Sequence, residues 1–250
     1  MIKRFDMDII EITYCFNLED NKKELFKLRL DPTSLELIDD ATEPPPEWAA
    51  LEYHQCPNCP YNKESNPDCV VAKHLSAVID RFGDICSYDN IGLEVISDER
   101  RVIQETTAQR AISSLLGLIF ATSGCAHTAY MKPMARFHLP LASQEETTFR
   151  AAGMYLLAQY FRKQAGKGGE LNMEGLSKIY RDLHVVNVAI SNRIRSAQTA
   201  EASINALVIL DTRANLMPFV IEDHFDEIQH LFDAYLSDKD EHAVEEMSVT

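Results

Sequence analysis

The sequence has few basic residues, no apolar run of signal-peptide length near its start, and no internal repeat or low-complexity tract. Its 24 Lys and Arg residues stand against 39 Asp and Glu residues, which gives a net charge of −15. Because binding to phosphates requires clustered Lys and Arg, we expect neither nucleic acid nor an anionic membrane as a partner. The lack of an export signal predicts a cytoplasmic protein.

One stretch, residues 111–131, is free of charge for long enough to raise the question of a membrane span. It contains several Ser, Thr and Gly residues and one His, which are too many polar groups for a helix surrounded by lipid. We therefore predict a buried central helix and no membrane partner.

Acidic side chains concentrate near the C-terminus. Residues 222–246 hold ten Asp and Glu residues and a single Lys. We expect residues 238–250 to form a disordered acidic tail, with a tail that binds a protein partner as the alternative. Neither that partner nor the oligomeric state follows from the sequence.

The first part of the chain is predicted to be an α+β unit. Apolar residues alternate over residues 7–18 and return at 25–30 after turn residues, which predicts a β-hairpin. A short third strand is expected at residues 35–38, and two more at 91–96 and 101–106. Residues 1–106 should therefore contain a small antiparallel sheet.

One helix should pack on this sheet. Asn66 is a favourable N-cap, Pro67 suits the first helical position, and Asp68 complements the helix dipole, so we expect a helix to begin there. Its buried face is predicted by apolar residues at spacings of three and four: Val71, Leu75, Val78 and Phe82.

Residues 107–237 are predicted to form a bundle of five or six helices. Ser143 and Glu146 fit a capping box, which opens a helix to about residue 164. Apolar spacing predicts a second helix over residues 176–194, a buried helix over 203–210, and a last helix that begins near Pro218.

The strongest chemical signal is a cluster of cysteines in the irregular loop at residues 54–69. Cys56 and Cys59 are separated by two residues, and Cys69 follows after nine more. A Cys-x-x-Cys turn places two sulfurs within reach of one metal ion, as in zinc knuckles and iron–sulfur loops. The dipole of the expected helix would lower the pKa of the Cys69 thiol.

A closed metal site needs a fourth ligand, and the candidates are His54, His74, Cys86 and Cys125. His74 lies five residues after Cys69, so the two side chains diverge by roughly 140° on a helix. His54 would lie on the side of the first cysteine in extended chain, as a ligand or as a donor to a sulfur. Cys125 follows a Thr-Ser-Gly break that would present its sulfur at a new helix N-terminus, and it is favoured.

The metal and its alternatives stay open at this point. Zinc is favoured, because tetrahedral thiolates would join the loop to the helix, and an iron–sulfur cluster is the alternative. A disulfide, a redox dithiol and unliganded core cysteines compete with both. Cys15 and Cys86 lie in apolar patterns and are predicted to be core residues.

A weaker hypothesis is a metal-dependent enzyme that uses His138 with Glu145 and Glu146. The competing interpretation is structural, because Glu146 belongs to the expected capping box and an apolar-flanked His is usually a hydrogen-bonded core residue. The basic residues of the segment 150–195 are predicted to be a solvated helical face, with an anion site as the alternative. They are Arg150, Arg162, Lys163, Lys167, Lys178, Arg181, Arg193 and Arg195.

Several short sequence motifs resemble those of an uncharacterised bacterial family, a domain of unknown function. They are HQCPNCP at residues 54–60, SLLG at 114–117, TSGC at 122–125, RFHLP at 136–140, EETT at 145–148 and MYLLAQYF at 154–161. The resemblance extends to about Tyr235 and implies no reaction. It implies a bacterial cytosolic protein and keeps Cys56, Cys59, Cys69 and Cys125 together as one set. Family members often have Pro where this chain has Ala126, and His74 has no counterpart in them.

These observations lead to one hypothesis. The chain is a cytosolic metal-binding protein whose cysteine site joins a sheet to a helical bundle. Whether it is an enzyme does not follow from the sequence.

Overall fold

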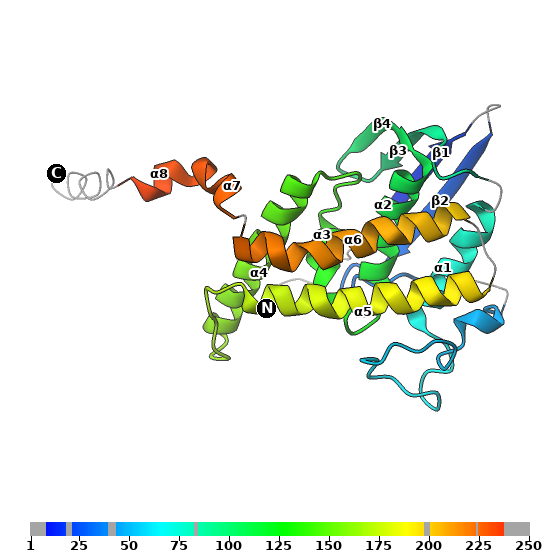
Figure 1. The fold of residues 1–250 in the computed structure, drawn as a ribbon, viewed down its shortest axis with the longest axis horizontal. Coiled ribbons are helices and arrows are strands. Elements are labelled where there is room, and N and C mark those ends of the chain that lie inside the picture. Colours follow the sequence, from blue (N-terminus) through cyan, green and yellow to red (C-terminus); the bar gives the residue numbers. More distant parts are fainter. Residues whose placement is uncertain are drawn as a thin grey trace.

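The computed structural model describes residues 9–18, 22–39, 44–82, 85–197, 201–223 and 225–237. The acidic tail predicted at residues 238–250 lies outside the described residues. Within them, the predicted α+β class is confirmed: an antiparallel sheet near the N-terminus is followed by a helical region (Figure 1).

The sheet has the strand order β2-β1-β3-β4. Its strands are β1 (Ile10–Asn17), β2 (Lys23–Leu30), β3 (Asn90–Ile96) and β4 (Arg101–Thr107), each antiparallel to its neighbour. Alternate residues of β1, namely Ile12, Tyr14 and Phe16, are buried, as the apolar alternation predicted. Both predicted hairpins are therefore confirmed.

The third strand predicted at residues 35–38 is wrong. The segment forms one isolated bridge, between Leu37 and Leu30 at the end of β2, where the Ile38 amide also donates to the carbonyl of Arg29 (2.8 Å). The Leu37 amide donates to the carbonyl of Thr122 (2.8 Å), and Leu35 has a positive φ of 56°. The segment turns toward a helix end instead of extending along the sheet.

The packed helix begins later than predicted. Helix α1 (Val70–Ile79) has Cys69 as its N-cap, so the start expected at Asn66 is wrong. Asp68 pairs with Ala50, beside the short 3-10 helix η2 (Glu47–Ala49), and the Cys69 amide donates to the carbonyl of Ala49 (2.8 Å). This pairing holds residues 67–69 extended, which delays the helix.

The predicted buried face of α1 is confirmed. Val71, Leu75 and Val78 are buried, and so is Phe82 in the 3-10 helix η3 (Asp80–Phe82) that continues α1. The Phe82 ring lies 4.9 Å from that of Phe16, between centroids, so this face packs on the sheet.

The helical region begins directly after β4. Its elements are α2 (Ala108–Thr122), η4 (Thr128–Met131), α3 (Lys132–Arg136), α4 (Gln144–Gln164), α5 (Glu174–Ser196), α6 (Glu201–Asp223), α7 (Asp226–Gln229), η5 (His230–Phe232) and α8 (Asp233–Leu236). The long helices α5 and α6 lie side by side, and α6 also packs on α2 (Figure 1). The predicted buried central helix, the capping box at Ser143 and the helices over residues 144–164 and 176–194 are confirmed.

The helix boundary predicted at Pro218 is wrong. Helix α6 runs through this proline, and the expected last helix is a series of short pieces from α7 to α8. Ala214, Met217 and Ile221 form one buried stripe on both sides of Pro218. Packing of that stripe offsets the hydrogen bond that the proline removes.

One core joins the two parts of the chain. It contains side chains of the sheet and of α1, α2, α5 and α6, with a second cluster between α4, α5 and α6.

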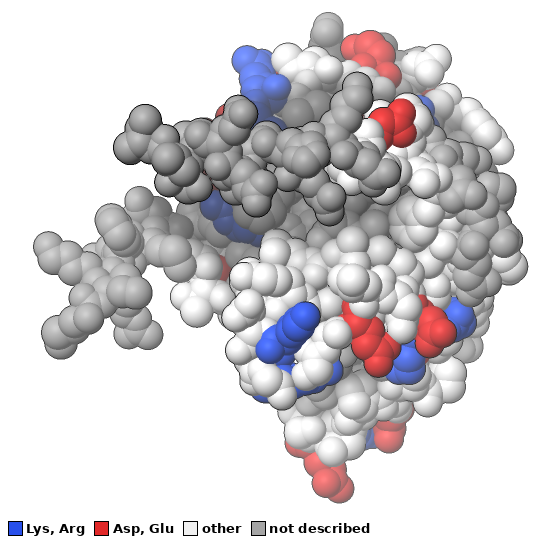
Figure 2. Space-filling view, turned by 90° about the vertical axis from the view of Figure 1, so that its left-hand side faces the viewer, with Lys and Arg blue, Asp and Glu red and all other residues white. Residues whose placement is uncertain are grey.

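Of the described helices, α6 is long and apolar enough over Ala202–Ile221 to cross a membrane, and a third of that stretch is buried. Core helices of soluble proteins have the same length and composition. On the face in Figure 2, described basic and acidic side chains are interspersed.

Candidate metal centre

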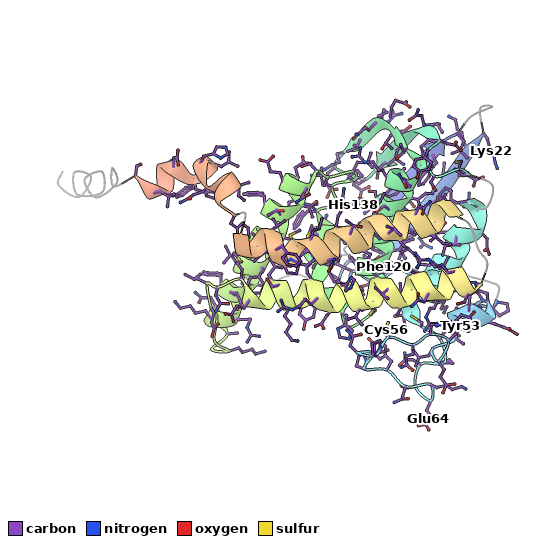
Figure 3. The ribbon with its side chains drawn as sticks, in the orientation of Figure 1. Lys22, Tyr53, Cys56, Glu64, Phe120 and His138 are labelled. Atoms are coloured by element: carbon purple, nitrogen blue, oxygen red, sulfur yellow. The ribbon has the colours of Figure 1, made fainter. Side chains whose placement is uncertain are left out.

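The Cys-x-x-Cys segment forms a tight turn in the loop between η2 and α1. The Cys59 amide donates to the carbonyl of Cys56 (3.0 Å). The base of the loop is closed by the Leu51 amide, which donates to the carbonyl of Pro67 (2.8 Å). Figure 3 shows Cys56 at the side of this loop that lies next to α5.

The other two predicted ligands flank this turn. Cys69 caps α1, and Cys125 follows α2 after a break at Ser123 and Gly124, whose φ is +86°. The predicted break is confirmed, but the helix expected to begin at Cys125 is the short η4, which begins at Thr128.

Two side chains hold the cysteine loop against the segment after α2. The Tyr61 hydroxyl donates to the carbonyl of Gly124 (2.9 Å). The Nε2–H of His127 donates to the carbonyl of Asn58 (2.6 Å), which is inside the Cys-x-x-Cys turn. Neither residue was singled out from the sequence, where only their nearness to cysteines marks them.

The four thiols share one electrostatic environment. Burial, with smaller contributions from the thiols of Cys69, Cys125 and Cys59, raises the pKa of Cys56 to about 12, while Arg193 opposes this shift. Burial also raises the pKa of Cys125, with backbone hydrogen bonds as the opposing effect and Cys69 as a further cause. Neighbouring thiols that repel one another's charge would be relieved by a bound cation.

The cysteine side chains do not have the geometry of a complete set of metal ligands in this structure. Among the described residues, no group of three or more His, Cys, Asp and Glu side chains has the geometry to hold a metal ion, and all six thiols are free. The thiols of Cys59, Cys69 and Cys125 each act on the Cys56 thiol, and the placement of each sulfur depends on one χ1 rotation. Metal binding by this cluster therefore stays a prediction.

The alternative fourth ligands lie in other surroundings. The His54 ring bonds the hydroxyl of Ser196 through Nε2 (3.0 Å). His74 is partly buried on α1, and burial lowers its pKa. Cys86 is exposed, so its prediction as a core residue is wrong: it sits in the turn before β3, where its amide donates to Asp89. Cys15 is buried, as predicted.

Arg193 is completely buried beneath the cysteine loop. Its guanidinium donates to the carbonyls of Trp48 (3.0 Å), Ala50 (2.6 Å) and Leu51 (2.7 Å). It forms no ion pair with any described acid, and its Nε has no partner among the described residues. The predicted solvated face is therefore wrong for Arg193, which lies on the same buried stripe of α5 as Ile190.

The residues of the enzyme hypothesis do not form a ligand group within the described chain. The His138 Nε2 is hydrogen-bonded to the hydroxyl of Tyr14. Glu146 completes the capping box with Ser143, as the structural interpretation predicted, and Glu145 is an exposed residue of the first turn of α4.

The fold defines an α+β protein with an antiparallel sheet followed by a helical region. Residues 12–233 match the family Domain of unknown function (DUF6901), and the chain belongs to this family. The predicted resemblance to a family of unknown function is thereby confirmed. No curated protein and no solved structure matches the chain.

Proposed function

We propose that the protein binds one structural zinc ion through Cys56, Cys59, Cys69 and Cys125. The site would join the loop, the start of α1 and the end of α2, which are distant in sequence. Four thiolates around Zn²⁺ satisfy its tetrahedral preference, and such a site contributes directly to folding. We also propose that the protein is located in the cytoplasm.

The observation that carries this proposal is the unpaired charge of Arg193. A fully buried guanidinium without an acidic partner is costly, and the three carbonyls around it supply hydrogen bonds without net charge. Zinc with four thiolates has a net charge of about −2. Such a site beside Arg193 would provide the missing negative charge.

The test is elemental analysis of anaerobically purified full-length chain, with a visible spectrum of the same sample. The proposal expects about one zinc per chain and no colour. Iron with sulfide and a brown colour would replace it with the iron–sulfur alternative and a redox role. Absence of any metal after growth with added zinc would overturn both.

Serine variants locate the site. Cys59→Ser should lose zinc and much of the stability, since it removes one ligand of four. Cys86→Ser is the matched control, because Cys86 is exposed and its side chain lies outside the cluster. Equal zinc content in the two variants would contradict the ligand assignment. Cys15→Ser should also retain zinc, although it changes a buried position.

A further inference from the structure

A cavity of about 200 Å³ lies between α2, α3, α4, α5 and α6. One water takes up about 30 Å³ in the liquid, so the cavity has room for several waters or a small ligand. It is separate from the cysteine loop: Figure 3 shows His138, which lines it, above α6 and Cys56 below α5.

The wall of this cavity is mainly apolar. Apolar side chains reach it from every surrounding helix except α4, among them Leu118, Phe120, Met131, Met134, Leu183 and Leu210. An apolar cavity with a few convergent polar groups is the common form of a small-molecule site. The polar groups therefore decide which ligand fits.

Three arginines line the cavity: Arg110, Arg150 and Arg213. None of them forms an ion pair with a described Asp or Glu, and no described acidic side chain lines the cavity. The chain has 39 acids to 24 bases, so this local excess of positive charge runs against its composition.

Two of these guanidiniums are held in place by uncharged groups. Arg150 donates to the carbonyls of Met134 (3.0 Å) and Phe137 (2.8 Å), and Arg213 donates to that of Ala142 (3.3 Å). Burial lowers the pKa of both arginines. Each is thus positioned and partly desolvated, and although the charge of Glu146 acts on Arg150, neither arginine forms an ion pair with a described acid.

Buried polar side chains also line the cavity. Tyr180, Asn187 and Ser113 have exposed fractions of 6%, 5% and 3%. The charges of Arg150 and Arg213 both act on the Tyr180 hydroxyl, so these three groups converge.

We propose that this cavity binds a small organic carboxylate with an apolar body. The carboxylate accepts hydrogen bonds from Arg150, Arg213 and Tyr180, and the body fills the apolar wall. Guanidinium–carboxylate hydrogen bonds are charge-assisted, and they strengthen where water is excluded. The predominantly apolar wall selects against a compact, fully hydrated anion.

The first experiment is calorimetric titration of the full chain as purified, near neutral pH, with three probes that share one tail: octanoate, octan-1-ol and octylammonium. Octanoate should bind at least ten-fold more tightly than octan-1-ol, and octylammonium should not bind measurably. Octanoate that binds no more tightly than octan-1-ol, or no binding by any probe, would overturn the proposal.

Two variants test the residues that are proposed to bind the carboxylate of the ligand. Arg213→Gln and Tyr180→Phe should each weaken octanoate binding about ten-fold, which corresponds to 1.4 kcal/mol, and leave octan-1-ol binding unchanged. Arg162→Gln is the matched control, since Arg162 is an exposed residue of α4 outside the cavity. Wild-type octanoate affinity in both test variants would refute the assignment. None of these outcomes depends on whether the cysteines bind zinc.

Discussion

His138 should make the fold less stable as the pH falls below neutral. Its Nε2 is bonded to the hydroxyl of Tyr14, which is also within 3.0 Å of the Ser114 hydroxyl. Burial, with smaller contributions from the positive charges of Arg150 and Arg100, lowers the pKa of His138 to about 4. The imidazole is therefore neutral in the folded protein at neutral pH, and Nε2 is free to accept the Tyr14 proton.

The sign and size follow from proton linkage. In the unfolded chain the His138 pKa is about 6.5, so between about pH 6.5 and 4 the unfolded chain binds a proton that the folded protein does not bind. Lowering the pH therefore stabilises the unfolded state. Each pH unit in this window is worth about 1.4 kcal/mol, so about 2 kcal/mol is lost between pH 6.5 and 5.

The assay is urea unfolding of the wild type and of His138→Gln, at several pH values from 8 to 5. Gln keeps a neutral acceptor for Tyr14 but does not titrate. The difference in unfolding free energy between the two proteins should stay constant above about pH 7.5 and change by about 2 kcal/mol by pH 5. The other titrating groups cancel in this difference. Parallel curves over the whole range would refute a buried, neutral His138.

Three further substitutions, and a fourth as a control for the last of them, test structural assignments by urea unfolding. Arg193→Met should lower the unfolding free energy by about 3 kcal/mol or more, because three buried carbonyls lose their donor; a loss below about 1 kcal/mol would contradict this role. Ser143→Ala should cost about 1 kcal/mol through loss of the capping box, and an unchanged midpoint would argue against it. Gly124→Ala should cost about 1 kcal/mol or more because φ is +86°, whereas Gly153→Ala, with open space around it on α4, should be neutral or stabilising.

Local patterns were sufficient for most of the fold. Alternation and turn residues fixed the four strands of the sheet, and spacings of three and four fixed the buried faces of α1 and α5. The errors arose where a distant partner decides the backbone. Asp68 is held extended by Ala50, and Leu37 bonds the end of α2, so neither boundary is encoded in its own neighbourhood.

The candidate metal site, too, could be predicted from the sequence only in part. The Cys56 and Cys59 turn is a local feature that its spacing reveals, whereas the approach of Cys125 depends on the Tyr61 and His127 hydrogen bonds between distant segments. Arg193 was assigned to solvent because charged residues usually are exposed. Its place on the apolar stripe of α5 is the signal that could have revealed its burial.

The two proposals share one argument from charge. Arg193 and the pair Arg150 and Arg213 are desolvated at two separate places, and no described acid pairs with any of them, in a chain that carries 39 acids. A buried cation needs a negative partner, so at each place the partner has to come from another source. Thiolates around a metal ion fit beside Arg193, because its charge acts on the Cys56 thiol, on which the thiols of Cys59, Cys69 and Cys125 also act. A ligand carboxylate fits beside Arg150 and Arg213, because a cavity lies there and no thiolate cluster does. Loss of zinc should therefore weaken the loop around Arg193 and leave octanoate binding in the cavity intact.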